Sequence, residues 1–300
     1  MLRLLRLTTT LLICLVFTGC AASSDHLVWK VEKNSYSFHL MGVVHTVPKE
    51  FSVLPNHIFE IYSASDVFIA ESVGYAKDPQ PNSKIGKSSN VYASSIPVVQ
   101  DMVAKGLTSG ELAKKMLSSD PADLYYMFDA VLNYKRILPQ KIEYVEGFDA
   151  QLFRRALREK KATDTLESRQ RAYESWAQKC NTTQDHFAII QSLRNALTDL
   201  DPLDDVNVIT NSFVQSGDIA ALTKMKADLV RKRVHVEYIE RCSVIPRNFE
   251  WIPKVEAFSQ KYQRPLVAVG SMHLTSEPSF LTLLKQNGYT LTRVRASEVK

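Results

Sequence analysis

The sequence PLVAVGSMH, residues 265–273, joins a short apolar run to a Gly-x-x-His motif. A run of this length, rich in Val and Leu, is typical of a strand buried on both faces of a sheet. A second β-rich run, Tyr36 to Val44, ends in the same way, because it passes through Gly42 to His45. α/β proteins bind ligands in the crevice at the ends of such strands. The two motifs therefore predict a sheet with strands from both ends of the chain and a histidine at the end of each.

Other patterns complete the α/β domain. Residues 28–31 and the Tyr36 run flank Lys33-Asn34-Ser35, which favours a turn, so we expect an opening hairpin. Further strands are expected at 66–71, 141–146 and 290–294, and helices at 55–65, 96–105, 109–117, 121–133, 149–160, 165–179, 183–197, 218–232, 247–262 and 277–286. These patterns predict one domain over residues 20–300, with a central mixed sheet built from the N- and C-terminal segments and flanked by helices. A polar loop at about 74–95 and a helical insertion at about 96–245 lie between those segments.

Composition and charge describe an ordinary globular chain. The 300 residues are 45% hydrophobic and 23% charged, which excludes disordered, fibrous and multi-span membrane classes. The net charge of +5 is spread along the chain, and its densest run, Arg231-Lys232-Arg233, fits the end of an amphipathic helix. We therefore expect no nucleic-acid partner.

The amino terminus carries an export signal. Arg3 and Arg6 precede an apolar run, Leu7 to Phe17, that is short for a bilayer span, so residues 1–19 are interpreted as a signal peptide. The run ends in FTGC, residues 17–20, which resembles a bacterial lipobox and makes Cys20 a candidate acylated residue. The alternative is an ordinary signal peptide with Cys20 incidental. We expect a lipid-anchored protein on the periplasmic side of the cell envelope, at the outer membrane in a Gram-negative cell, since no aspartate follows Cys20.

The remaining cysteines are compatible with an oxidising compartment. Cys14 lies in the leader, so Cys180 and Cys242 are the two left in the folded body besides Cys20. A disulfide between them would close a loop of about 60 residues and add roughly 4 kcal/mol of stability if unstrained. Two separate buried thiols are the alternative.

Two Gly-x-x-His motifs in one chain exceed chance. With 10 Gly and 7 His among 300 residues, about 0.2 such spacings are expected at random. Glycine permits a sharp turn at the strand end, so the histidine three residues later can face the crevice. The run that begins at Asp66 ends on Glu71, a carboxylate that is costly to bury unless it is paired, hydrated or metal-bound. His45, His273 and Glu71 therefore form a candidate site for a divalent cation such as Zn, Mn, Co or Fe(II), with positions left open for water and substrate.

A purely structural role is the alternative for these three residues. His45 and His273 could each cap a strand by hydrogen bonding to nearby backbone, and Glu71 could pair with a core arginine. The residues alone leave both interpretations open.

Several segments match one known family: residues 27–31, 39–45, 66–71, 147–149, 166–170 and 216–218, and most specifically Arg247-Asn248, residues 267–274 and residues 288–290. Through these segments the chain resembles the TraB/PrgY/GumN family, which is related to the Tiki metalloproteases. The resemblance covers nearly the whole chain after the leader. Met41, Val43, Phe148 and Thr165-Leu166 depart from the GumN pattern, but the candidate ligands are present.

The resemblance implies roles for particular residues. His45 and His273 match the paired motif histidines and Glu71 matches the acidic partner, whereas Arg247 and Asn248 match polar groups that line the site. In Tiki-like members these features accompany Mn- or Co-dependent peptide cleavage. We expect Arg247 to bind an oxyanion or a substrate carboxylate through its donor fork, and Asn248 to orient water or substrate. Arg247 could instead be a helix-start arginine in a surface ion pair.

These observations favour a metal-dependent hydrolase that cleaves peptide bonds by metal-activated water. The alternative is a non-catalytic envelope protein that binds a peptide or glycan in the same crevice. Glu277 is a candidate general base, although an acid in a first helical turn is ordinary capping. The sequence has no His-Glu-x-x-His, Gly-x-Ser-x-Gly, Cys-x-x-Cys or Gly-x-Gly-x-x-Gly motif, so the chemistries that depend on those motifs are excluded.

Overall fold

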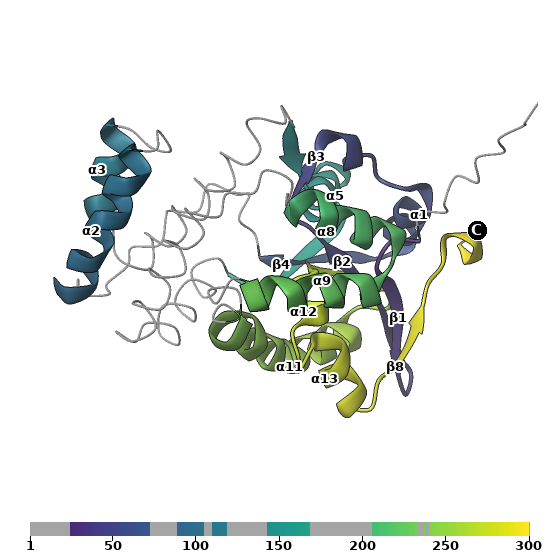
Figure 1. Ribbon diagram of the computed structural model, residues 1–300. Coiled ribbons are helices and arrows are strands. Elements are labelled where there is room, and N and C mark those ends of the chain that lie inside the picture. Colours follow the sequence, from purple (N-terminus) through teal and green to yellow (C-terminus); the bar gives the residue numbers. More distant parts are fainter. Residues whose placement is uncertain are drawn as a thin grey trace, which may run out of the picture.

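The computed structural model describes residues 25–72, 89–104, 110–118, 143–168, 206–232, 237 and 240–299. Its strands are β1 (Val28–Lys33), β2 (Tyr36–Val43), β3 (Thr46–Pro48), β4 (Val67–Ser72), β5 (Tyr144–Glu146), β6 (Ala162–Glu167), β7 (Pro265–Gly270) and β8 (Thr290–Arg293). Its α-helices include α1 (Asn56–Ala64), α2 (Ser89–Ala104), α3 (Gly110–Ser118), α5 (Phe148–Glu159), α8 (Val206–Ser216), α9 (Ile219–Lys232), α11 (Ile245–Lys261), α12 (Met272–Thr275) and α13 (Phe280–Gln286). Figure 1 shows helices on both sides of a twisted sheet.

The central sheet has six strands in the order β6-β4-β7-β2-β1-β8. The strands β6, β4, β7 and β2 run parallel, and β1 and β8 add antiparallel pairs at one side. The hairpin between β1 and β2 turns at Asn34, whose φ of 55° is tolerated by its short polar side chain. The predicted mixed sheet with strands from both ends of the chain is confirmed.

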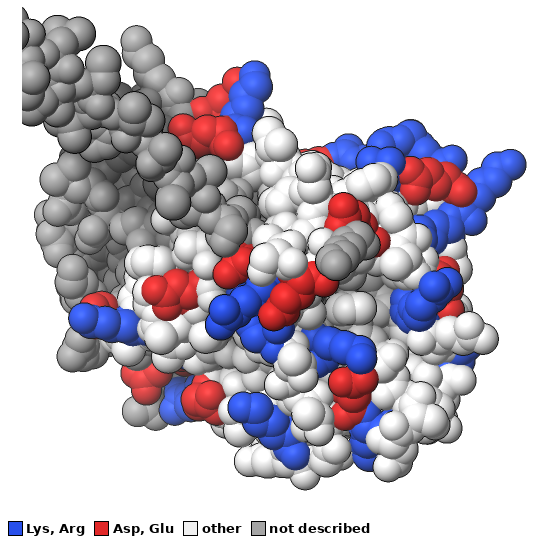
Figure 2. Space-filling view, turned by 90° about the vertical axis from the view of Figure 1, so that its right-hand side faces the viewer, with Lys and Arg blue, Asp and Glu red and all other residues white. Residues whose placement is uncertain are grey.

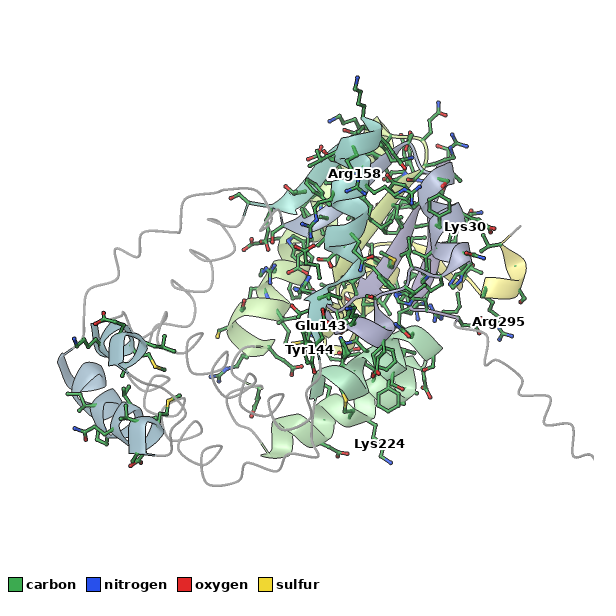
Figure 3. The ribbon with its side chains drawn as sticks, turned by 90° about the horizontal axis from the view of Figure 1, so that it is seen from above. Lys30, Glu143, Tyr144, Arg158, Lys224 and Arg295 are labelled. Atoms are coloured by element: carbon green, nitrogen blue, oxygen red, sulfur yellow. The ribbon has the colours of Figure 1, made fainter. Side chains whose placement is uncertain are left out.

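Side-chain alternation along the strands divides the core into two clusters. In β4, Val67 and Ile69 face one side and Phe68 and Ala70 face the other, and all four are buried. The first side packs against α8, α9, α11 and α13, whereas the second packs against α1 and α5. Figure 3 shows this arrangement from above, with Arg158 of α5 and Lys224 of α9 on opposite sides of the sheet. Both faces of the parallel strands are therefore covered, as parallel sheets require.

The described surface mixes charges of both signs. On the face shown in Figure 2, Lys and Arg side chains lie interspersed with Asp and Glu. In the parts of the chain that the structure describes, every helix is too short or too polar to cross a bilayer.

One strand of the central sheet comes from the middle of the chain, where helices were expected. Residues 165–167 were expected to begin a helix but belong to β6, which pairs in parallel with β4. Thr163 and Thr165 are two positions apart, so their side chains lie on the same face of the strand. β-Branched residues favour a strand when a neighbouring strand is available for pairing. The expected helix at 165–179 is therefore wrong over these residues, and tertiary pairing overrides the local pattern.

Smaller differences concern the ends of elements. Helix α2 begins at Ser89, so residues 89–95 of the expected polar loop are helical. Helix α13 begins at Phe280, because Pro278 disfavours helical backbone at the preceding residue and Ser279 caps the helix through Thr282 N. Helix α8 and the short pairing of β3 with β5 were not expected.

Several expectations lie outside the described residues. They concern the leader 1–19 with Cys20, the loop at 74–88, the helices at 121–133 and 183–197, and Cys180. Cys242 is described and is disulfide-bonded. Its pairing with Cys180 stays a prediction.

Candidate functional site

The four parallel strands each bring one polar side chain to the same edge of the sheet. His45 follows β2, His273 follows β7 in α12, Glu71 lies near the end of β4, and Glu167 is the last residue of β6. The carboxyl ends of parallel strands meet at one edge, where ligands bind in open α/β sheets. Two motifs that are 228 positions apart are thus brought together by the pairing of β2 with β7.

The motif glycines provide space rather than an unusual turn. A Cβ on Gly42 would lie 2.5 Å from Leu274 Cδ1, and a Cβ on Gly270 would lie 3.0 Å from His45 Nε2 and 3.2 Å from Glu71 Oε2. Neither glycine is among the residues with positive φ. Each motif glycine therefore leaves space for side chains at the other motif. The sharp turn expected at the strand ends does not explain why these positions are glycine.

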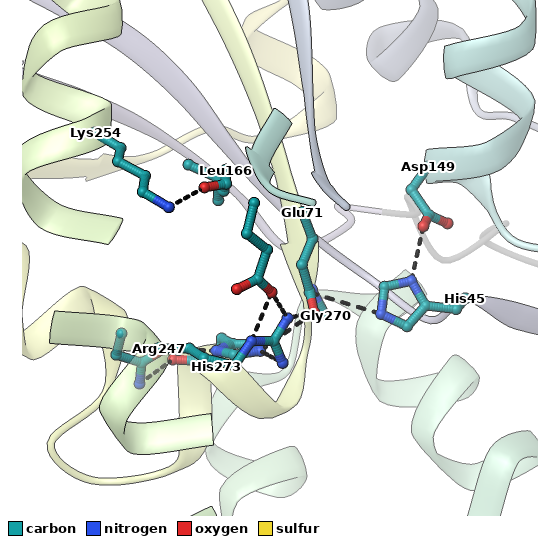
Figure 4. A network of polar contacts seen from close by, with 10 residues as sticks. His45, Glu71, Asp149, Leu166, Arg247, Lys254, Gly270 and His273 are labelled. Atoms are coloured by element: carbon teal, nitrogen blue, oxygen red, sulfur yellow. Dashed lines mark hydrogen bonds and ion pairs between the residues drawn. The ribbon is translucent and has the colours of Figure 1, made fainter. Parts of the chain in front are cut away.

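Glu71 is the centre of the site (Figure 4). Its Oε1 lies 2.5 Å from Arg247 Nη2 and 3.6 Å from His273 Nε2. Its Oε2 accepts a hydrogen bond from Gly270 N at 2.8 Å and lies 3.7 Å from His45 Nε2. Both histidines thus turn Nε2 toward one buried carboxylate.

His273 is enclosed and held in one tautomer. Its Nδ1 lies 2.6 Å from Asn248 Oδ1, and its ring packs on Trp251 with centroids 4.2 Å apart. The Asn248 amide nitrogen donates to the carbonyls of His273 and Pro278, so its oxygen must accept from His273 Nδ1. Nε2 of the neutral ring therefore presents a lone pair to the site. Asn248 is completely buried, so it orients His273 directly.

His45 is held in the same way but from a more open position. Its Nδ1 lies 2.7 Å from Asp149 Oδ2, and Asp149 stands in the first turn of α5. The His45 side chain is 50% exposed, whereas the His273 side chain is 4% exposed. The open side of the site is therefore at His45.

Arg247 joins two carboxylates beneath the histidines. Its Nε donates to Glu167 Oε1 at 2.7 Å, its Nη2 contacts both Glu71 and Glu167, and its Nη1 lies 3.4 Å from His273 Nε2. The guanidinium also lies over the Trp251 ring, 4.8 Å from the centroid. It comes from the first turn of α11 and is buried, so the surface ion pair considered from sequence does not apply.

The surroundings shift the pKa values of the site in different directions. Burial raises the pKa of Glu71, but the charge of Arg247 and both histidines outweigh it, so the pKa lies well below the ordinary value. Burial raises the pKa of Glu167 more than Arg247 lowers it. Burial lowers the pKa of His273 more than Glu71 raises it. Desolvation also lowers the pKa of His45, but the hydrogen bond and charge of Asp149, with Glu71, raise it to about 9.

Two of these site residues were missed by sequence reasoning. Glu167 ends a strand on a carboxylate, as Glu71 does, but its strand was interpreted as a helix. Asp149 lies in residues 147–149, one of the segments on which the family resemblance rests, but that resemblance gave it no role in the site. Glu277 is engaged elsewhere, since its carboxylate accepts from Ser279 N and from the Thr282 hydroxyl at the start of α13. Glu277 therefore binds groups at the start of α13, but it precedes the helix rather than standing in its first turn, as was expected.

The donor set fits a divalent cation in its chemistry. Within the described ranges, no three or more His, Cys, Asp or Glu side chains are placed to hold a metal ion as they stand, and Arg247 contacts one oxygen of Glu71. Yet two imidazoles direct Nε2 at one carboxylate, and each is held at Nδ1 by an oxygen acceptor. Histidines that ligate metals are oriented in this way. Gly270 leaves a space bordered by His45 and Glu71, which a Cβ would fill.

A sequence model of the TraB/PrgY/gumN family matches residues 27–293. The match spans both Gly-x-x-His motifs and all the site residues described above. Neither the curated proteins nor the solved structures gave a match to this chain.

Proposed function

We propose that this chain, which belongs to the TraB/PrgY/gumN family, is an exported metal-dependent hydrolase that cleaves peptide bonds. The observation that supports the proposal is the convergence of two oriented imidazoles on one buried carboxylate, at the edge of the sheet where ligands bind.

His45, Glu71 and His273 would hold the cation, with Mn or Co preferred and Zn possible. Imidazole and carboxylate suit these metals. A bound divalent ion of this kind supplies a water nucleophile at neutral pH and polarises a carbonyl oxygen. Asn248 fixes His273 so that its Nε2 lone pair faces the site.

Other groups of the chain set charge and access. Arg247 directs Nε and Nη2 at carboxylates, which leaves Nη1, beside His273, as the donor for an oxyanion or a substrate carboxylate. The half-exposed side of His45 admits a substrate, because the opposite side of the site is closed by Trp251 and the buried ring of His273. Glu167 holds Arg247 from below and keeps its guanidinium in place.

Export and anchoring belong to the same proposal. We expect acylation of Cys20 after removal of residues 1–19, with the domain on the periplasmic side of the envelope. Mass spectrometry of the mature protein from a bacterial host should detect a lipid-modified Cys20. A Cys20→Ser variant should lose the modification and leave the membrane fraction. A mature chain that starts elsewhere and carries no lipid would contradict this part.

The hydrolase proposal is tested with a peptide library and the purified mature protein, treated with chelator and then given Mn or Co. We expect cleavage only with metal, and its loss in His45→Ala and His273→Ala. His39→Ala is a matched control, because His39 lies on the same strand as the first motif and the charges that act on its ring are those of Lys30 and Glu32. This variant should cleave like the wild type.

A negative result separates the two functions considered from sequence. Metal binding without cleavage of any peptide would favour a binding protein for a peptide or glycan. Absence of metal binding in wild type and variants alike would remove the metal-dependent hydrolase altogether.

A further inference from the structure

We propose that Asp149 is a positioning residue, which holds the His45 ring by Nδ1 so that Nε2 stays directed at Glu71. The inference deepens the proposed function and rests on it, because His45 is one of the residues assigned there to the cation.

The start of α5 is attached to His45 through both backbone and side chain. Gly147 N donates to His45 O at 2.8 Å, and Asp149 Oδ2 lies 2.7 Å from His45 Nδ1. A Cβ on Gly147 would clash with the Val44 carbonyl oxygen and lie 2.9 Å from the His45 carbonyl carbon. Glycine therefore lets the two segments approach closely enough for Asp149 to reach the ring.

The two partners differ in how firmly they are held. Asp149 is 3% exposed, and its neighbours Phe148, Ala150 and Leu152 are buried in the core on that face of the sheet. The His45 side chain is half exposed, and within the described residues Asp149 is the one hydrogen-bond partner of its ring. The buried carboxylate of Asp149 thus orients the His45 ring, which few packing contacts hold in place.

The second motif shows what such an acceptor does and which chemistry suffices. Asn248 Oδ1 accepts from His273 Nδ1 and leaves Nε2 directed at Glu71. The acceptor there is a neutral amide oxygen, so an ionised carboxylate is not required to fix the ring. An asparagine at position 149 should therefore preserve the orientation of His45, and an alanine should not.

The test compares Asp149→Ala and Asp149→Asn with the wild type by two measurements. The first is the affinity of the chelator-treated protein for Mn, read from the free Mn signal in electron paramagnetic resonance. Loss of a group that orients a ligating histidine weakens metal binding by about 10- to 100-fold, and we expect that loss in Asp149→Ala. Asp149→Asn should weaken binding by less than about tenfold, because its amide oxygen can still accept from Nδ1.

The second measurement needs no metal. Long-range ¹H–¹⁵N correlation spectra of the metal-free protein, recorded where the ring is neutral and assigned by comparison with His45→Ala, report which ring nitrogen carries the proton. We expect a proton on Nδ1 in the wild type and in Asp149→Asn, and a mixture of tautomers in Asp149→Ala. Glu143→Ala is the matched control, because it removes an exposed carboxylate a few residues upstream that pairs with Lys49.

Each outcome is decisive. Wild-type Mn affinity and a single Nδ1–H tautomer in a folded Asp149→Ala variant would overturn the proposal. Should that variant not fold, an Nε2–H tautomer in the wild type would overturn it without any substitution at 149. If the wild type binds none of Mn, Co and Zn, the proposed function fails, whereas the tautomer measurement still decides the role of Asp149.

Discussion

The two Gly-x-x-His motifs meet at Glu71 from different environments. The carboxyl-terminal motif places His273 against Trp251 and holds it with the amide of Asn248, all of them buried. The amino-terminal motif places His45 at the open side and holds it with the carboxylate of Asp149. The same spacing in sequence thus yields one enclosed and one accessible histidine. The difference comes from the helices, since α11 supplies Asn248 and Trp251, and α5 supplies Asp149.

Removal of Glu71 should have the largest effect, because both motifs depend on it. Glu71→Ala leaves Arg247 with Glu167 as its remaining carboxylate and removes the carboxylate toward which both histidines direct Nε2. Breaking a buried ion pair typically costs about 3–5 kcal/mol. We expect a loss of that order in the free energy of unfolding in urea, together with loss of Mn binding. A variant that unfolds at the wild-type urea concentration would show that Glu71 does not hold the site together.

The acceptors of the two histidines should differ in their contribution to stability. Asn248→Ala leaves the Nδ1 proton of the enclosed His273 ring and two backbone carbonyls without their hydrogen-bond partner. An unsatisfied buried group of this kind lowers the free energy of unfolding by about 1–3 kcal/mol. Asp149→Ala should cost less, because water can reach the half-exposed His45 ring. The free energies of unfolding of the two metal-free variants, measured in urea, check this order. The reverse order would contradict the view that the second motif is the enclosed one.

Gly270→Ala should push the His45 ring away from Glu71 with little loss of stability. The added methyl group would lie 3.0 Å from His45 Nε2 and 3.2 Å from Glu71 Oε2, and both are ends of side chains that can shift. We expect a net loss of about 1 kcal/mol in unfolding free energy, because the crowding by the added methyl group is partly offset by the lower conformational entropy of the unfolded chain. Mn binding should be clearly weaker by titration. Gly42→Ala is the comparison, because its methyl group would press on Leu274 rather than on a candidate ligand. Equal Mn affinities in the two variants would remove the distinction.

The smallest expected effect is a difference in titration between the histidines in metal-free protein. The pKa of His45 is raised from 6.5 to about 9, so its contribution to stability is present below pH 6.5 and is lost as the pH rises through about 9. The pKa of His273 is lowered, so its contribution is present above pH 6.5 and is lost as the pH falls below that value. Nuclear magnetic resonance titration of the two rings checks both directions. Similar midpoints for the two rings would contradict the difference in their environments.

Much of the sheet could be predicted from sequence because its strands are marked by local patterns. The apolar runs of β4 and β7 and the turn at Asn34 are each visible within a few residues. Strand β6 could not be predicted in this way, because Ala162–Glu167 lacks an apolar run and is stabilised by pairing with β4. The candidate ligands were visible as residues that end strands, and the error over β6 is the reason that Glu167 was missed.

The sequence by itself determined the α/β class and the family resemblance. It also identified His45, Glu71 and His273 as candidate ligands. Only the tertiary structure decided that Asp149 and Asn248 orient the two histidines and that Arg247 joins Glu71 to Glu167. It also decided that Gly42 leaves space for Leu274 and Gly270 leaves space for His45. The physical reason is range. Burial of an apolar run leaves a periodic signal along a few neighbouring residues, whereas a buried polar group takes whichever partner the packing of distant elements brings within about 3 Å.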